Sequence, residues 1–169
     1  MAEIHKWKGF AELEQNLLAL GREIHEKGVK RMMSQAAVPM RDDAKRRAPV
    51  LQTPTPRRLP GTLRDAIRIW RQRRTPYAVT YYVGVKRLSR GAIRKFKMEQ
   101  KSKGRRSVSS DNPKDPYYWL WVESGTSKMA ARPYLRPAFE SKKTESVRVA
   151  LKEGQEFIRK TVAKFKRVR

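Results

Sequence analysis

Apolar residues recur at steps of three and four near the start of the chain, and this spacing predicts a helix. Five of them share one face: Phe10, Leu13, Leu17, Leu20 and Ile24. The pattern resumes after Gly28 and runs to Ala44. Pro39 interrupts it, because proline removes a hydrogen bond and clashes with the preceding turn. We predict one long bent helix or two helices meeting near Val38. The apolar stripe is either ordinary core packing or a surface shared with a neighbouring subunit.

Two later segments have patterns typical of β-structure. Residues 50–60 hold three prolines and predict a stiff connector. From Thr62 to Arg74 the pattern favours a short helical turn that passes into a strand. Residues 77–85 then alternate β-branched and aromatic side chains, which is the strongest strand signal in the chain. Together the two segments predict an antiparallel pair with helices covering one face.

A second apolar stripe predicts a helix from Ser141 to Arg169. Its members are Val147, Leu151, Ile158, Val162 and Phe165. The predicted fold is therefore α+β, with a long bent N-terminal helix and a C-terminal helix packed on a small antiparallel sheet. We predict a single domain over residues 1–169, with a basic loop insertion at 86–116 and a basic C-terminal tail at 160–169.

The chain is organised around residues 115–140, which begin with an almost fully apolar run from Tyr117 to Val122. Aromatic side chains of this size stabilise a fold by about 2–3 kcal/mol each when buried, so we expect this run to be buried. A polar turn follows, in which Gly125 takes a positive φ at little cost. Pro137 suits the first turn of the last helix. We expect Tyr134, Leu135 and Phe139 to pack on the same core or on a neighbouring subunit.

Two motifs in this order resemble a family of tailed-phage proteins. Residues 121–126 read WVESGT, and residues 133–140 read PYLRPAFE. A second, less specific similarity lies upstream, where Ala48-Pro49 is followed by GTLRDAI at residues 61–67. The family pattern has Thr-Gly and a later Ser in that element, whereas this chain has Gly61-Thr62 and Ala66. The chain resembles the tail-completion or head–tail joining proteins of long-tailed phages, akin to the minor tail protein Z type of phage lambda.

This resemblance implies a structural virion protein of the neck, assembled in the host cytoplasm. Such a protein finishes the head-proximal end of the tail as a homo-oligomeric, six-fold ring. Its implied neighbours are the tail terminator, the head-closure or connector proteins and the packaged double-stranded DNA. The motif residues are then expected to be structural or to lie at subunit interfaces: Tyr117, Tyr118, Trp119, Trp121, Glu123, Gly125, Thr126, Pro133, Tyr134, Leu135, Arg136, Pro137 and Phe139.

The net charge of +25, from 41 Lys and Arg against 16 Asp and Glu, points to a polyanionic partner. Residues 86–106 alone hold ten bases and one acid, Glu99. This basic segment is a solvated insertion without a partner, a contact for an acidic neighbouring protein, or a contact for nucleic acid. We favour contact with nucleic-acid phosphates, without recognition of the bases. The candidate contacts are Arg94, Lys95, Lys97, Lys101, Lys103, Arg105, Arg106, Arg71, Arg73 and Arg74.

Catalytic signatures are weak, and we predict neither an enzyme nor a cofactor. The chain has no cysteine and only two histidines, without a metal-binding spacing. We expect Glu123 to form a structural ion pair with Arg132 or Arg136, and Asp42-Asp43 to lie on a solvated helix face. The sequence has no 18-residue apolar run and no signal pattern, so we expect no membrane partner. The alternative function is a free, basic nucleic-acid-binding protein associated with ribosomes or the nucleoid.

Overall fold

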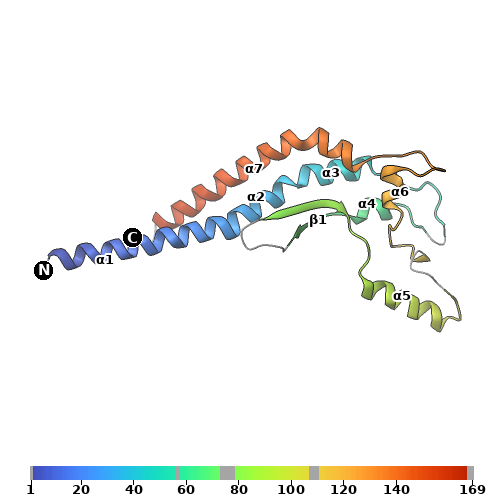
Figure 1. Cartoon of the computed structure of the whole chain (residues 1–169), viewed down its shortest axis with the longest axis horizontal. Coiled ribbons are helices and arrows are strands. Elements are labelled where there is room, and N and C mark those ends of the chain that lie inside the picture. The colour runs from blue at the N-terminus through green and yellow to red at the C-terminus, as the bar shows by residue number, and fades with distance from the viewer. Residues whose placement is uncertain (1, 56–57, 73–78, 107–110, 167–169) are drawn as a thin grey trace. The chain divides into compact units, whose positions relative to one another are not determined.

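The computed structural model of the chain describes residues 2–55, 58–72, 79–106 and 111–166. The fold is α+β, as predicted, with helices and one antiparallel sheet of two strands (Figure 1). The elements in chain order are α1 (Ala2–Glu23), the π-helical turn η1 (Ile24–Gly28), α2 (Val29–Ala36), α3 (Val38–Arg47), α4 (Thr62–Ala66), β1 (Ile67–Gln72), β2 (Thr80–Val85), α5 (Arg90–Ser102), α6 (Trp119–Ser124) and α7 (Leu135–Lys166).

The predicted break in the N-terminal helix is confirmed at Ala37, which separates α2 from α3. Pro39 falls in the first turn of α3, where its missing N–H has no helical partner to lose. The π-helical turn η1 was not predicted. The passage from a helical turn to a strand is confirmed by α4 and β1, and β2 lies within the predicted second strand.

The chain folds into two compact units, and the first contains α1, η1, α2 and the part of α7 from Thr144. Within this unit α7 runs back along η1 and α2 (Figure 1). A Cβ placed on Gly28 would lie 2.7 Å from the Phe157 ring, so any larger residue at this position would have to displace the ring. Arg31 pairs with Glu153 at 3.0 Å, and Lys164 lies 3.6 Å from Glu23. These contacts pack one side of α7 against α2, η1 and the end of α1.

The second unit comprises residues 37–70 and 82–143 and holds the hydrophobic core. Tyr134 and Ile67 are fully buried there, with Trp119, Val122 and Leu135 packed against the core. The core therefore combines α3, α4, both strands and the start of α7. Its buried members are Ala44, Ala48, Leu63, Ile67, Val85, Tyr134 and Ala138.

The predicted burial of the run from Tyr117 to Val122 is wrong in part within the single chain. Leu120 and Trp121 are about half exposed, since α6 is a single short helix with one face on the core. Phe139 is 52% exposed, because it lies on the outer side of α7 from Tyr134 and Ala138. Of the two predicted alternatives for Phe139, packing on a neighbouring subunit therefore stays a prediction. Core packing does not account for most of the N-terminal stripe, because Phe10, Leu13 and Leu17 are exposed. The alternative, a surface shared with a neighbouring subunit, stays a prediction.

The basic segment is more regular than a loop, since α5 spans Arg90–Ser102 and extends the short helix considered for residues 92–99. Ser89 caps it by accepting a hydrogen bond from the Ala92 amide at 3.2 Å. The final helix also begins earlier than predicted, at Leu135, so Pro137 lies in its first turn as expected. Across the described helices, none combines the length and apolar character needed to cross a membrane.

Candidate functional site

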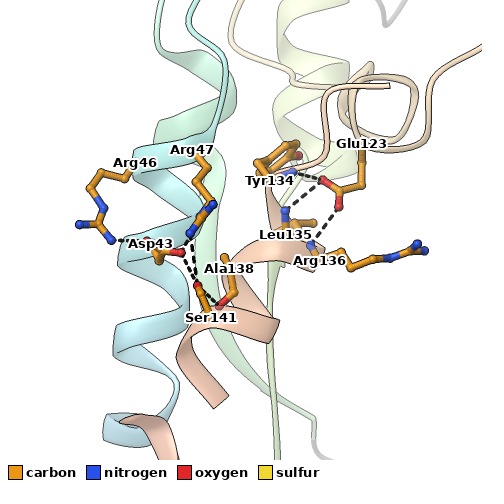
Figure 2. Close-up of polar contacts among 9 residues, drawn as sticks. All are labelled: Asp43, Arg46, Arg47, Glu123, Tyr134, Leu135, Arg136, Ala138 and Ser141. Atoms are coloured by element: carbon orange, nitrogen blue, oxygen red, sulfur yellow. Dashed lines mark hydrogen bonds and ion pairs between the residues drawn. The ribbon is translucent and has the colours of Figure 1, made fainter. Parts of the chain in front are cut away.

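The motif segment is held together by the carboxylate of Glu123, which caps the start of α7 (Figure 2). Its Oε2 accepts hydrogen bonds from the amides of Tyr134 and Leu135 at 2.8 and 3.0 Å, and Oε1 accepts one from the Arg136 amide at 3.0 Å. These amides have no partner inside the helix, and the helix dipole favours a negative charge there. The predicted ion pair of Glu123 with Arg132 or Arg136 is therefore wrong, because both carboxylate oxygens accept hydrogen bonds from backbone amides instead.

Gly125 ends α6 with φ 75°, which confirms the predicted positive φ. A Cβ at this position would lie 2.8 Å from the Ala131 nitrogen and 3.0 Å from the Met129 oxygen. Thr126 and Met129 then exchange backbone hydrogen bonds of 2.9 and 3.2 Å, and the Arg132 amide donates to the Val122 carbonyl at 2.8 Å. This tight return brings the chain back to Glu123 with the correct geometry for the cap.

An aromatic cluster surrounds the start of α6. The Tyr117 ring meets Tyr118 and Trp121 edge to face, with ring centroids 5.5 and 5.8 Å apart. The Arg58 guanidinium lies 4.9 Å from the Tyr118 centroid, a cation–π contact. Burial is the main cause that raises the pKa of Tyr118. Since Trp121 and Leu120 remain half exposed beside this cluster, the single chain presents apolar surface here.

Asp43 of α3 binds α7 through Ser141. Its side chain is only 3% exposed, so the prediction that Asp43 lies on a solvated helix face is wrong. It accepts hydrogen bonds from Arg46, from Arg47 Nε at 2.6 Å and from Ser141 Oγ at 2.8 Å (Figure 2). Burial alone would raise the pKa of Asp43, but the bonds from Arg47, Ser141 and Arg46 outweigh it and hold the pKa at about 2. Asp42 is exposed and pairs with Arg41.

Helix α5 carries a stripe of cations along one face. Four exposed side chains follow the spacing i, i+4, i+7 and i+11, namely Arg90, Arg94, Lys97 and Lys101. The half-buried Ala92, Ile93 and Phe96 lie on another face of the helix. The stripe spans about 16 Å at 1.5 Å per residue, which equals the rise of about five phosphates along one DNA strand.

A buried carboxylate fixes the chain immediately before α5. Asp115 is 1% exposed and pairs with Arg87, whose Nη2 lies 2.8 Å from Oδ2. The Leu88 amide also donates to Asp115 at 3.3 Å. The hydrogen bond from the Arg87 guanidinium to Asp115 raises the pKa of Arg87, although burial acts in the opposite direction. Asp115 thus ties the basic helix to the segment that leads into α6.

The structure gathers some of the predicted phosphate contacts and separates others. Arg94, Lys97 and Lys101 share the α5 stripe, whereas Lys95 lies on a different face of the helix. Lys103 is paired with Glu99 at 2.6 Å, and Arg105 and Arg106 are exposed after the helix. Arg71 lies in β1 and is half-buried. Arg73 and Arg74 lie outside the described residues.

Sequence reasoning missed three residues of these polar clusters. Arg90 could have been found from its helical spacing to Arg94 and Lys97. Asp43 and Asp115 gave no local signal, because their partners Ser141 and Arg87 lie far along the chain.

These features define a class: a small, strongly basic α+β protein whose described polar clusters hold its own backbone and helices together. The chain belongs to the HK97-gp10-like family, whose model, described as "Bacteriophage HK97-gp10, putative tail-component", matches residues 11–125. That match covers more than half of the 169 residues. The protein is thus a tail component of a bacteriophage and part of the virion. Searches of curated proteins and of solved structures found no match.

Proposed function

We propose that this tail component is the neck protein that completes the head-proximal end of the tail and joins it to the head. The motifs WVESGT and PYLRPAFE carry the proposal, because they form the capped junction of α6 and α7 and their residues resemble those of tail-completion proteins. The half-exposed Trp121, Leu120 and Phe139 beside this junction supply apolar surface for ring neighbours. The ring is homo-oligomeric and six-fold, with the tail terminator and a head-closure protein as its neighbours.

The charge distribution supports a position next to packaged DNA. The α5 stripe presents cations at helical spacing and has no aromatic side chain among them, which suits contact with phosphates rather than stacking on bases. Like charges crowded into a closed ring repel one another unless an anion lies between them. We infer that α5 faces the DNA-bearing lumen and neutralises phosphates without reading sequence.

The neck role is tested with a phage that lacks this protein. We expect DNA-filled heads and tails of normal length that do not join, or tails with an unfinished head-proximal end, seen by negative-stain microscopy. Expression of the protein in trans should restore joined virions. Normal infectious virions without the protein would exclude the neck role.

The DNA contact is tested by changing Arg90, Arg94, Lys97 and Lys101 together to Gln. A matched control removes the same charge from exposed cations outside α5, by changing Arg22, Arg68, Lys114 and Lys128 to Gln. Each lost phosphate contact should reduce the slope of log affinity against log salt by about 0.9. For the α5 variant we expect the magnitude of this slope to fall by about 3 to 4 on any duplex sequence, since four contacts are removed. For the control variant we expect little change in the slope. Equal losses in both variants would show that net charge, not α5, governs DNA binding. Lost tail joining with unchanged DNA affinity would point to an acidic protein neighbour.

A further inference from the structure

The apolar stripe that runs along α1 into η1, called the α1 seam below, has the spacing of a coiled-coil seam. Among the described residues, no helix faces it over much of its length. Its members follow steps of three, four, three and four, which keeps them in line along the helix: Phe10, Leu13, Leu17, Leu20 and Ile24. Ile24 and Leu20 are half-buried, whereas Phe10, Leu13 and Leu17 are 71%, 47% and 58% exposed.

The reason for this exposure is the reach of α7 within the same unit. The contact nearest its end joins Lys164 to Glu23, and the described helix ends at Lys166. Phe10 lies 13 residues before Glu23, which is about 20 Å along an α-helix. The apolar seam therefore continues past the point where α7 covers it, and a second helix is needed to complete it.

The charge of this stretch is opposite to that of the chain. Residues 10–26 contain four acids, Glu12, Glu14, Glu23 and Glu26, against one base, Arg22. The whole chain carries a formal net charge of +25. Glu23 is paired within its own chain with Lys27 and Lys164, which leaves Glu12, Glu14 and Glu26. An apolar stretch with this acid excess is complementary to the basic remainder of the protein and is poorly suited to pair with its own copy.

The outer face of α7 has the complementary pattern. Val147, Leu151 and Ile158 are 59%, 60% and 47% exposed and follow the spacing i, i+4, i+11, which aligns them on one stripe. Three exposed cations with the same spacing lie beside this stripe, namely Arg148, Lys152 and Arg159. None of the three cations has an ion-pair partner within the part of the chain that the structure describes.

We propose that the α1 seam of one copy packs on the outer face of α7 of a second copy. Apolar side chains meet along the two stripes, and Glu12 and Glu14 of α1 face the cations of α7. Because two different surfaces meet, the contact is heterologous, and its repetition builds a ring when the rotation closes. The contact deepens the proposed neck function by supplying the ring interface, yet it does not depend on where the ring lies in the virion.

Engineered disulfides test this contact, because the chain has no native cysteine. Full-length Leu17→Cys and Leu151→Cys variants are purified, concentrated and oxidised in low salt, singly and as a mixture. We expect disulfide-linked dimers in the mixture and few in either variant alone, with the yield falling as salt rises. Dimers from Leu17→Cys alone would indicate pairing between α1 helices and overturn the proposal. Dimers from Leu151→Cys alone, or none in any sample, would overturn it as well.

A matched pair of variants separates the seam from general hydrophobicity. Leu17 and Leu18 are adjacent and about equally exposed, but only Leu17 lies on the seam. Leu17→Gln should weaken self-association about tenfold in sedimentation equilibrium, whereas Leu18→Gln should leave it unchanged. Equal effects of the two changes would refute the seam. Cross-linking in solution together with normal virions made without the protein would remove the neck role and leave this contact standing.

Discussion

Glu123 offers the sharpest test of how the motif segment is built. Its carboxylate accepts three backbone hydrogen bonds at the start of α7, at 2.8, 3.0 and 3.0 Å. Hydrogen bonds to a charged group contribute about 1.5–3 kcal/mol each, but water replaces part of this at the exposed Arg136 amide. We expect Glu123→Ala to lower the free energy of unfolding by about 2–4 kcal/mol. Glu123→Gln keeps one acceptor oxygen and should cost about 1–2 kcal/mol.

The measurement is urea unfolding followed by tryptophan fluorescence, since Trp119 lies in α6 beside the cap. Glu140→Ala is the matched control, because Glu140 is an exposed acid on α7, the helix that Glu123 caps. Among the described residues Glu140 pairs only with Lys143, at 3.0 Å. A surface pair of this kind contributes about 0.5 kcal/mol or less. The free energy of unfolding of the control should lie within about 0.5 kcal/mol of the wild-type value. If that of Glu123→Ala does so too, the carboxylate does not stabilise the start of α7 and the reasoning is refuted.

Three further predictions follow from buried or strained groups. The Tyr134 hydroxyl is buried with no hydrogen-bond partner in the described chain, so Tyr134→Phe should leave the melting temperature unchanged or raise it, and a clear fall would contradict this. Gly125→Ala should cost about 1–3 kcal/mol beyond Gly104→Ala, since both have positive φ but only Gly125 lies against backbone atoms. Asp43 has its pKa lowered from 3.8 to about 2, so it stabilises the fold above about pH 4 and loses this effect as the pH falls toward 2. In acid titrations the stability gap between wild type and Asp43→Asn should shrink by about 1–2 kcal/mol over that window, and a constant gap would contradict the assignment.

Local chemistry made part of this fold predictable from the sequence. Pro39 indicated the helix break, Gly125 indicated the positive φ, and Pro137 indicated the first turn of the last helix. In each case one residue restricts its own backbone, so the outcome does not depend on distant partners. The change from helix to strand near Ile67 was visible for the same reason, because the periodicity changes within a few residues.

Contacts between distant segments could not be predicted in this way. The sequence around Asp43 does not show that Asp43 will be buried with Ser141 as a hydrogen-bond partner. Likewise, the sequence around Glu123 does not show that its carboxylate will bind backbone amides instead of an arginine side chain. The half-exposed Trp121 is a different kind of miss. Apolar composition implied burial, but a helix as short as α6 turns only part of its surface to the core.

The position of Tyr134 has a consequence for the order in which the protein folds. The core formed by Ala44, Ile67 and Val85 is completed by Tyr134 and Ala138, and the bond between Asp43 and Ser141 joins residues 98 positions apart. Closing such a separation costs chain entropy before any contact is gained, which slows folding. A nascent chain that has reached only residue 125 still lacks the tyrosine that fills its core. The second unit therefore stays open, with its apolar surface uncovered, until most of the polypeptide has left the ribosome.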